Sequence, residues 1–307
     1  MDERGERKTG PIELAPHVHM LGTSEFPYFL IRGSEACAIF EGGISALATV
    51  AMDHLASLDV FVPLRYLVAA HTHTDHVTGL VRLKRAEPRL VFIATHDSAK
   101  VLAREKVVTH FADEDMMYCE QLVEKGVLPT VPAPMSGDPV MVDREVTDLE
   151  TLDLGGVTLE FLEAPGHAPG NLCVRVPEDG VLFATDTPGY AQTPQDVYPM
   201  FFHDYARYME SLERLKTLEF DTMFLGHNVG IHGRGQCMAF VDHALAEARI
   251  MRADMANRVS GGEDREKVAR EWGQRLGEFP FFTRFPERVL TGFADLLIRR
   301  SLEAEQS

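Results

Sequence analysis

The sequence predicts an α/β protein in which two β-sheets pack face to face and helices cover their outer faces. Short apolar segments bounded by turn residues, which are typical of buried strands, fall in two stretches, residues 17–95 and 151–227. Helical segments follow each stretch, and the apolar face of a sheet or helix must be buried against another layer. The 307 residues are enough for one large domain with its own core.

The first strand-rich stretch has a clear order of elements. Residues 28–32 and 36–40 predict a hairpin that turns at a Gly-Ser pair. Residues 65–70 form an apolar run that is too short for a helix and leads directly into the sequence HTHTDH, so we interpret it as a buried strand that ends in a loop. Residues 77–86 then favour a helix, and residues 90–95 favour another buried strand.

The segment from about 97 to 146 is less regular. It opens with DSAKVLARE, which predicts a helix with Asp97 or Ser98 as its N-cap, and it ends in a Pro-rich stretch. We expect an insertion or lid here, while a surface excursion without function is the alternative.

The second half repeats the pattern of strands followed by helices. Strands are predicted at 157–162, 171–177, 181–185 and 222–226, with an amphipathic helix at 204–219. Three further helices are predicted at about 236–258, 264–277 and 286–303. We therefore divide the chain into a catalytic domain, residues 12–235, and a C-terminal helical extension packed on it, residues 236–307.

Composition excludes several classes of partner. The net charge of −17 and the lack of a Lys/Arg cluster argue against nucleic acid, because binding a phosphate backbone needs clustered cations. No uncharged run is long enough for a membrane span, and the N-terminal MDERGERKTG has no apolar signal-peptide core. The four cysteines are widely spaced. We expect a cytoplasmic protein with reduced thiols that acts on a small molecule, with a homodimer through the C-terminal helices as one possible assembly.

The segment His71-Thr72-His73-Thr74-Asp75-His76 carries the strongest functional signal. Three imidazoles and a carboxylate within six residues are hard to explain as packing. On an extended chain alternate residues point the same way, so His71 and His73 can hold one ion, with Asp75 next in that alternation. His76 then points elsewhere and can serve a second ion. Imidazole and carboxylate ligands without thiolate suit zinc, iron or manganese in a catalytic site.

Three more candidate ligands each follow a predicted strand. His167 lies in APGHAPGN, where glycine and proline on both sides favour a tight turn. Asp186 follows the apolar VLFAT, and a carboxylate at the end of a buried strand is costly unless it is paired or binds a metal. His227 ends TMFLGH.

The order of these motifs resembles the metallo-β-lactamase superfamily over about residues 12–232. The resemblance rests on HTHTDH (71–76), PGH (165–167), FATD (183–186) and GH (226–227). It implies an αββα sandwich with the metals at one edge, to which this chain adds C-terminal helices. It also implies two divalent metal ions, with zinc preferred to iron or manganese. The first metal would be held by His71, His73 and His167, the second by Asp75, His76 and His227, and Asp186 would bridge both.

Within the superfamily, HTHTDHVTGL and APGHAPGN are most similar to the glyoxalase II and lactonase-like hydrolases. Glu41 stands where a turn containing Asp is usual, so we expect it to take that place beside the ligands. The C-terminal helices do not match the glutathione-binding domain of glyoxalase II, so glutathione thioesters are not the expected substrates.

The expected reaction is hydrolysis of an ester, thioester or lactone by a metal-bound hydroxide that the catalytic residue Asp75 orients. A mononuclear iron oxidoreductase similar to persulfide dioxygenases is the main alternative, because it shares the motifs. Flavodiiron proteins fit less well, because they have Glu where this chain has His73 and they carry a flavin domain. A phosphodiesterase uses the same ligands, but the acidic charge disfavours it.

Aromatic residues after Asp186 suggest part of a substrate pocket. The stretch from Tyr190 to Tyr208 includes Phe201 and His203, and a loop there would border the metals. Packing of the helix at 204–219 onto the core is the alternative explanation. Tyr190 could donate a hydrogen bond to the substrate, as a tyrosine shortly after the bridging aspartate does in lactonases.

Overall fold

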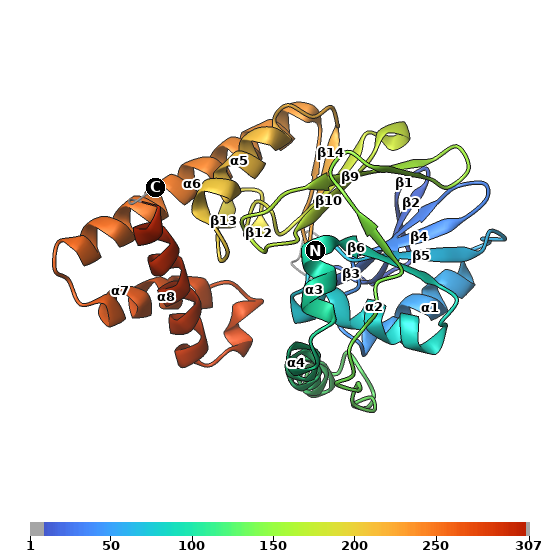
Figure 1. Ribbon diagram of the computed structural model, residues 1–307, viewed down its shortest axis with the longest axis horizontal. Coiled ribbons are helices and arrows are strands. Elements are labelled where there is room, and N and C mark those ends of the chain that lie inside the picture. Colours follow the sequence, from blue (N-terminus) through green and yellow to red (C-terminus); the bar gives the residue numbers. More distant parts are fainter. Residues whose placement is uncertain (1–8, 305–307) are drawn as a thin grey trace.

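Two stacked β-sheets form the centre of the computed structural model, which describes residues 9–304 (Figure 1). The first sheet keeps its strands in chain order: β1 (Ile12–Ala15), β2 (Val18–Thr23), β3 (Phe26–Arg32), β4 (Cys37–Phe40), β5 (Leu64–Val68), β6 (Val91–Thr95) and β7 (Arg144–Val146). Strands β1 to β4 are antiparallel neighbours, whereas β4 to β7 run parallel. The predicted hairpin at 28–40 is confirmed as β3 and β4.

The second sheet has a mixed order. It runs β15 (Gly230–His232), β14 (Thr222–Leu225), β11 (Val181–Thr185), β10 (Leu172–Val176), β9 (Thr158–Glu163) and β8 (Thr151–Asp153). Strands β11 and β14 are parallel and the other neighbours are antiparallel. A separate hairpin, β12 (Tyr190–Thr193) and β13 (Asp196–Tyr198), follows β11.

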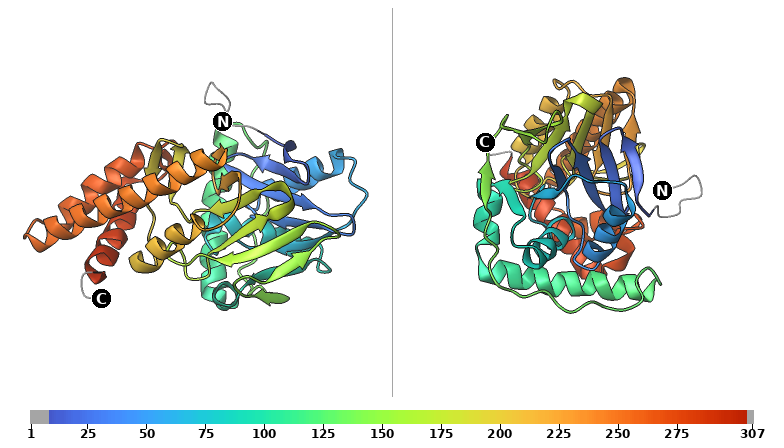
Figure 2. Two further views of the ribbon diagram at one scale, coloured as in Figure 1. Left: turned by 90° about the horizontal axis from the view of Figure 1, so that it is seen from above. Right: turned by 90° about the vertical axis from the view of Figure 1, so that its right-hand side faces the viewer.

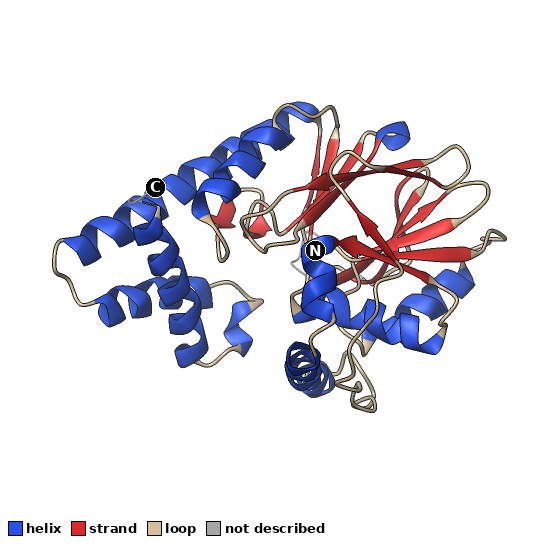
Figure 3. Ribbon diagram, in the orientation of Figure 1, coloured by secondary structure: helices blue, strands red, loops and turns tan. Residues whose placement is uncertain are grey.

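Helices cover the outer faces of both sheets, so the predicted αββα sandwich is confirmed (Figure 3). On the side of the first sheet lie α1 (Leu47–Ser57), α2 (Thr74–Ala86), α3 (His96–Leu102) and α4 (Glu105–Glu124). On the side of the second sheet lie α5 (Tyr205–Leu215) and α6 (Arg234–Ser260). The short helix η1 (Pro177–Asp179) links β10 to β11, and η2 (Phe282–Arg284) precedes the last helix.

The C-terminal helices extend to one side of the sandwich (Figure 2). Helices α7 (Arg265–Gly277) and α8 (Glu287–Glu303) pack on each other and on the long α6. The bounds of the three C-terminal helices agree with the prediction to within two residues at each end. The segment between α7 and α8 contains η2 and returns toward the strand ends, where Arg284 forms a buried ion pair with Glu25.

Aromatic packing holds the two sheets together. Phe29 and Phe40 of the first sheet meet Phe183 and Phe224 of the second, with the ring centroids of Phe29 and Phe183 4.6 Å apart. All four side chains are buried, and each contributes about 1.5–3 kcal/mol through the hydrophobic effect. The strands read as nearly continuous apolar runs because both faces of each sheet are covered.

The region from 97 to 146 differs most from the expectation. It contains the 20-residue helix α4, which was not predicted from the sequence. Asp115 on α4 is fully buried and accepts hydrogen bonds from the Ser45 amide and hydroxyl and from the Thr78 hydroxyl, which fixes α4 against α2 and the loop after β4. The N-cap of α3 is Thr95, which accepts from the Ser98 amide, so the prediction of Asp97 or Ser98 was wrong by two to three positions.

Among residues 9–304, none of the helices combines the length and apolarity that crossing a bilayer requires. The expectation that the N-terminus carries no signal peptide concerns mainly residues 1–8, which lie outside the described part of the chain.

Candidate metal centre

The HTHTDH segment joins a strand to a helix. Strand β5 ends at Val68, His71 and His73 lie in the connecting loop, and α2 begins at Thr74 with His73 as its N-cap. Asp75 and His76 therefore lie on the first helical turn. The expectation that Asp75 continues the strand-like alternation of His71 and His73 was wrong, because the chain leaves the extended conformation after His73.

The other three candidate residues lie at the same edge of the sandwich. His167 follows β9, Asp186 directly follows β11 and His227 follows β14. Strand β9 is antiparallel to β10, which is antiparallel to β11, and β11 is parallel to β14. The three strands thus share one direction, and their C-terminal ends bring the side chains together.

These seven side chains form two adjoining groups. His71, His73 and His167 make one group, and Asp75, His76 and His227 make the other; within each group the potential ligand atoms lie within 4.8 Å of one another. The Asp186 carboxylate lies between the groups. Its Oδ2 is 3.2 Å from His76 Nε2, 3.7 Å from His167 Nε2 and 3.9 Å from His227 Nε2.

Three imidazoles are oriented by acceptors behind them. The Nδ1 of His76 donates to Glu41 Oε2 at 2.7 Å, that of His167 to the Met200 carbonyl at 2.9 Å, and that of His227 to the Glu25 carbonyl at 2.7 Å. Carbonyl and carboxylate oxygens only accept, so each Nδ1 carries a hydrogen. Each Nε2 then faces the centre, which is how metal-binding histidines are usually held.

The donor atoms of the site fit metal binding. The buried Nε2 of His71 has no hydrogen-bond partner among the described residues, and the Nε2 of His76 has only the Asp186 carboxylate, 3.2 Å away. The Nδ1 of His73 and the Nε2 of His167 face each other at 3.0 Å. Buried imidazole nitrogens without partners are costly, and a shared cation removes that cost.

Burial lowers the pKa of some of these imidazoles, whereas nearby carboxylates raise the pKa of His76. Burial, together with neighbouring imidazoles, lowers the pKa of His71 well below its ordinary value and lowers that of His167 to about 3. Burial also acts on His76, but the charges of Glu41, Asp186 and Asp75 outweigh it and hold the pKa of His76 well above the ordinary value. Without a metal, His76 therefore binds a proton that a cation would displace.

Backbone features close to the ligands are also unusual. A Cβ at Gly226 would lie 2.4 Å from Asp186 Oδ1 and 2.8 Å from His76 Cε1, so only glycine fits beside the carboxylate. Glu41, Thr185 and Asn228 have positive φ angles of 65°, 48° and 52°. Such conformations are costly for residues other than glycine and cluster at functional sites.

A family model described as "Metallo-beta-lactamase superfamily" matches residues 27–227, a span that contains all seven of these side chains. The chain belongs to the metallo-β-lactamase superfamily.

Sequence relatives within the superfamily differ in their described activities. The chain is 28% identical over 209 residues to a metallo-β-lactamase fold-containing protein of Sulfurisphaera tokodaii, covering 63% of this chain and 70% of that protein. It is 26% identical over 178 residues to a coenzyme F420H(2) oxidase of Methanothermobacter marburgensis, covering 56% and 37%. It is 24% identical over 165 residues to a hydroxyacylglutathione hydrolase of Rhodopseudomonas palustris, covering 52% and 47%. The chain thus spans less than half the length of the last two relatives.

Solved structures of the superfamily share the fold over most of the chain. A metallo-β-lactamase family protein from Thermus thermophilus superposes with a TM-score of 0.66 at 18% identity, covering 96% of this chain and 95% of that one. A metallo-β-lactamase from Cronobacter sakazakii gives a TM-score of 0.58 at 22% identity, covering 80% and 98%.

A cavity of about 290 Å³ opens onto the superfamily's metal-binding edge. The candidate ligands His73, Asp75, His167, Asp186 and His227 form its floor. Its walls come from the start of α2, α4, the loop before α5, the segment around η2, and α8. The wall residues are Thr74, His110, Phe111, Glu114, Tyr118, Met200, Phe202, Phe281, Phe282, Phe285, Phe293 and Leu296.

The structure does not bring the three predicted substrate residues to this cavity. The Tyr190 hydroxyl donates to Gln192 at 2.8 Å, and its buried ring packs on Phe281 and Phe282. Phe201 is buried against α5, as the alternative explanation expected, and its neighbour Phe202 lines the cavity instead. His203 also lies off the cavity wall.

Sequence reasoning missed the C-terminal phenylalanines because they lie far along the chain from any ligand. The segment FPFFTRF at 279–285, with four phenylalanines in seven residues, was the available signal. The face of α4 that carries Phe111, Glu114 and Tyr118 was missed because that helix was not identified. Their spacing of three and then four residues places these three side chains on one face.

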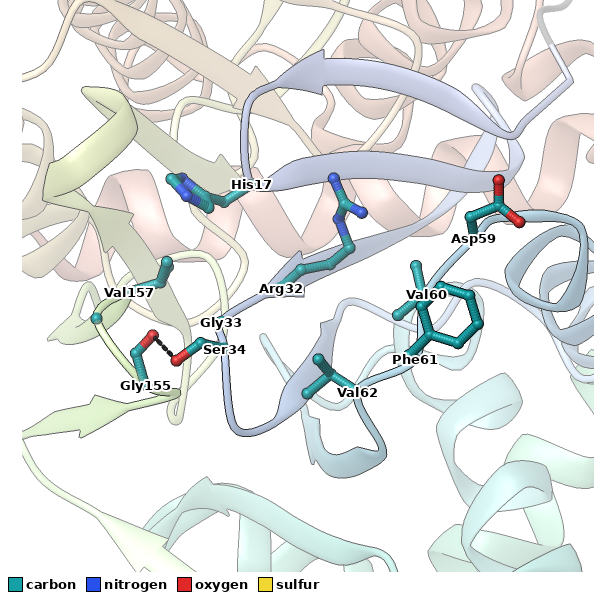
Figure 4. A pocket seen from close by; sticks show the side chains of 11 residues that line it. His17, Arg32, Gly33, Ser34, Asp59, Val60, Phe61, Val62, Gly155 and Val157 are labelled. Carbon is teal, nitrogen blue, oxygen red and sulfur yellow. Dashed lines mark hydrogen bonds between the residues drawn. The ribbon is translucent and has the colours of Figure 1, made fainter.

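A second hollow lies at the other end of β4 and β5 (Figure 4). His17 and Val157 stand on one side of it and Val60 and Phe61 on the other. Metal-ligand groups among residues 9–304 are confined to the edge described above, so this hollow has a different chemistry.

Proposed function

We propose that this protein is a two-metal hydrolase that cleaves an ester, thioester or lactone. The observation that carries the proposal is the pair of adjoining ligand groups with the Asp186 carboxylate between them. Two divalent cations held there would supply a nucleophile at neutral pH and would stabilise negative charge on a carbonyl oxygen. The similarity to a protein described as a hydroxyacylglutathione hydrolase also supports hydrolysis.

The residues of the chain have separate roles in this proposal. His71, His73 and His167 would hold one cation, Asp75, His76 and His227 would hold the other, and the Asp186 carboxylate lies between the two groups. Glu41 acts through His76, whose ring it orients. Asp75 is only partly buried and lines the cavity, so its carboxylate can orient the attacking water.

The proposed reaction transfers the acyl group of the substrate to water. Water adds to the acyl carbon, the C–O or C–S bond breaks, and the proton removed from water ends on the leaving alkoxide or thiolate. The Tyr118 hydroxyl on the cavity wall can donate a hydrogen bond to the substrate. Burial and the charges of Asp75 and Glu114 raise the pKa of Tyr118 well above its ordinary value, so the hydroxyl keeps its proton.

Metal analysis combined with one pair of variants tests the proposal. Purified protein should contain two zinc ions per chain and should hydrolyse 4-nitrophenyl esters. Asp75→Ala should lower kcat by at least about a hundredfold, the size of a general acid–base contribution. Asp59→Ala, which removes an exposed carboxylate beside the second hollow, is the matched control and should retain activity.

Three results would contradict the proposal. One iron per chain, with dioxygen consumption and no ester hydrolysis, would favour the mononuclear oxidoreductase. Wild-type turnover in Asp75→Ala would remove the role of that carboxylate. Phosphodiester cleavage without carboxylic ester cleavage would assign the site to the phosphodiesterase class.

A further inference from the structure

The cavity above the candidate ligands is rich in aromatic and apolar side chains and, among the described residues, is lined by no lysine or arginine. Seven of its seventeen lining residues are aromatic, and Met200 and Leu296 add further apolar surface. The same lining, which belongs entirely to the described part of the chain, includes no lysine or arginine. The walls therefore offer no permanently charged cationic side chain to a carboxylate or phosphate that enters.

Glu114 adds a negative charge to one wall. It belongs to neither of the ligand groups described above, so its charge is not used in holding a cation. The Thr74 hydroxyl donates to its carboxylate, which fixes the side chain next to the start of α2. His110 is one turn away on α4, with Nε2 3.5 Å from Glu114 Oε1, and both side chains are substantially exposed. The wall therefore presents a positioned carboxylate on its open side.

The opposite wall is apolar and comes from the C-terminal extension. Phe281 and Phe282 are buried, whereas Phe285, Phe293 and Leu296 are only partly buried and so leave apolar surface facing the cavity. The ring centroids of Phe285 and Phe293 are 5.9 Å apart in an edge-to-face arrangement. Such a surface is stabilised when an apolar group covers it.

We propose that this cavity selects substrates whose acyl group is apolar and uncharged, and that Glu114 rejects acyl groups that carry a carboxylate. The proposal rests on the proposed hydrolase function and names its substrate class. The cavity volume of about 290 Å³ lies at the lower end of the range for small-molecule sites, which suits an acyl chain of a few carbons or one phenyl ring. The C-terminal extension is then a specificity element that supplies the apolar wall.

A matched pair of esters tests the selection. The 4-nitrophenyl esters of pentanoic acid and of glutaric acid have the same five-carbon acyl chain and differ in one terminal carboxylate. With the zinc-loaded protein, kcat/KM should be at least about fiftyfold higher for the pentanoyl ester. The negative charge of Glu114 and the cost of placing the glutaryl carboxylate against apolar walls both oppose the glutaryl ester.

Variants separate the two walls. Glu114→Gln should raise the ratio of glutaryl to pentanoyl kcat/KM at least fivefold. Phe293→Ala should lower kcat/KM for the pentanoyl ester about tenfold, because part of the apolar surface is lost. Phe61→Ala is the matched control, since Phe61 is 94% exposed beside the second hollow, and it should change neither value.

Binding of uncleaved analogues distinguishes failure of the selection from failure of the hydrolase function. Calorimetric titration with the anilides of pentanoic and glutaric acid should show binding of the pentanoyl anilide alone. If neither ester is hydrolysed but the anilides differ in this way, the hydrolase function is wrong and the selection stands. If both esters are hydrolysed with equal kcat/KM, or if Glu114→Gln leaves their ratio unchanged, the proposed selection is overturned.

Discussion

From the buried ion pair between Arg284 and Glu25 we predict that the C-terminal extension stabilises the candidate metal centre. The Arg284 side chain is 2% exposed and that of Glu25 6%. The guanidinium lies over the rings of Phe281, Phe26 and Tyr118, at 4.4, 5.5 and 5.7 Å from their centroids. The Glu25 carbonyl accepts the hydrogen bond of His227. Arg284 thus connects η2 to a candidate ligand through a single residue.

Replacing this arginine should destabilise the protein strongly. Arg284→Met keeps much of the side-chain volume but leaves the Glu25 carboxylate buried without its cation. Breaking a buried pair in this way costs about 3–5 kcal/mol, and loss of the ring contacts adds about 0.5–2 kcal/mol. We therefore expect the free energy of unfolding, measured with urea, to fall by at least about 3 kcal/mol. Zinc affinity should fall by up to about tenfold, because the position of Glu25 sets the orientation of His227.

The chain offers an internal control for this experiment. Arg265 pairs with Asp295 between α7 and α8 through two hydrogen bonds, but the two side chains are 40% and 47% exposed. Arg265→Met should cost less than about 1 kcal/mol, as exposed pairs do. The reasoning would be refuted if both variants lost the same free energy, or if Arg284→Met left zinc affinity and stability unchanged. A double-mutant cycle with Glu25→Gln should show a coupling above about 1 kcal/mol.

Three further predictions concern the metal site. Gly226→Ala should weaken zinc binding at least about tenfold in a chelator competition, because the new Cβ would meet the Asp186 carboxylate; Gly235→Ala, which meets no atom within 4 Å, should not. Glu41→Gln should also weaken zinc binding about tenfold, since it removes the negative charge next to its imidazole partner. Metal-free protein should lose stability as the pH falls below about 6.5. In the unfolded chain His167 binds a proton in this range, whereas in the folded protein its pKa is lowered to about 3 and the ring stays neutral. Between pH 7 and pH 5.5, the free energy of unfolding in urea should fall less for His167→Asn than for the wild-type protein, and an equal fall would contradict this role of His167. The expected contribution of His167 is up to about 1.4 kcal/mol per pH unit.

The sequence indicated the candidate metal centre more clearly than the walls of the cavity, for a physical reason. Metal ligation needs a few side-chain types at strand ends, so HTHTDH and the turn around His167 are visible in the chain itself. The fold followed from the same strands, because the apolar runs are short and bounded by turns. The place of Asp75 on a helical turn was not visible, since Thr74 can stand equally in a loop or at a helix start.

The cavity could not be read from the sequence because its wall depends on tertiary packing. Phe201 and Phe202 are adjacent and chemically identical, yet one is buried against α5 and the other faces the ligands. Which of the two rings is buried depends on the backbone direction after Met200, whose carbonyl accepts a hydrogen bond from His167. Likewise, α4 and the C-terminal phenylalanines reach the site only because the sandwich brings their ends together.

Two of the acceptors that orient the imidazoles belong to the main chain, and this makes the centre tolerant of change. A peptide oxygen is present whatever residue occupies the position, so Met200 can be exchanged for another amino acid while the bond to His167 persists. The loop that bears it can therefore change in sequence, and with it the shape of the cavity, without loss of the hydrogen bond that orients His167. By contrast, His76 depends on one particular carboxylate, so evolution has far less freedom at Glu41.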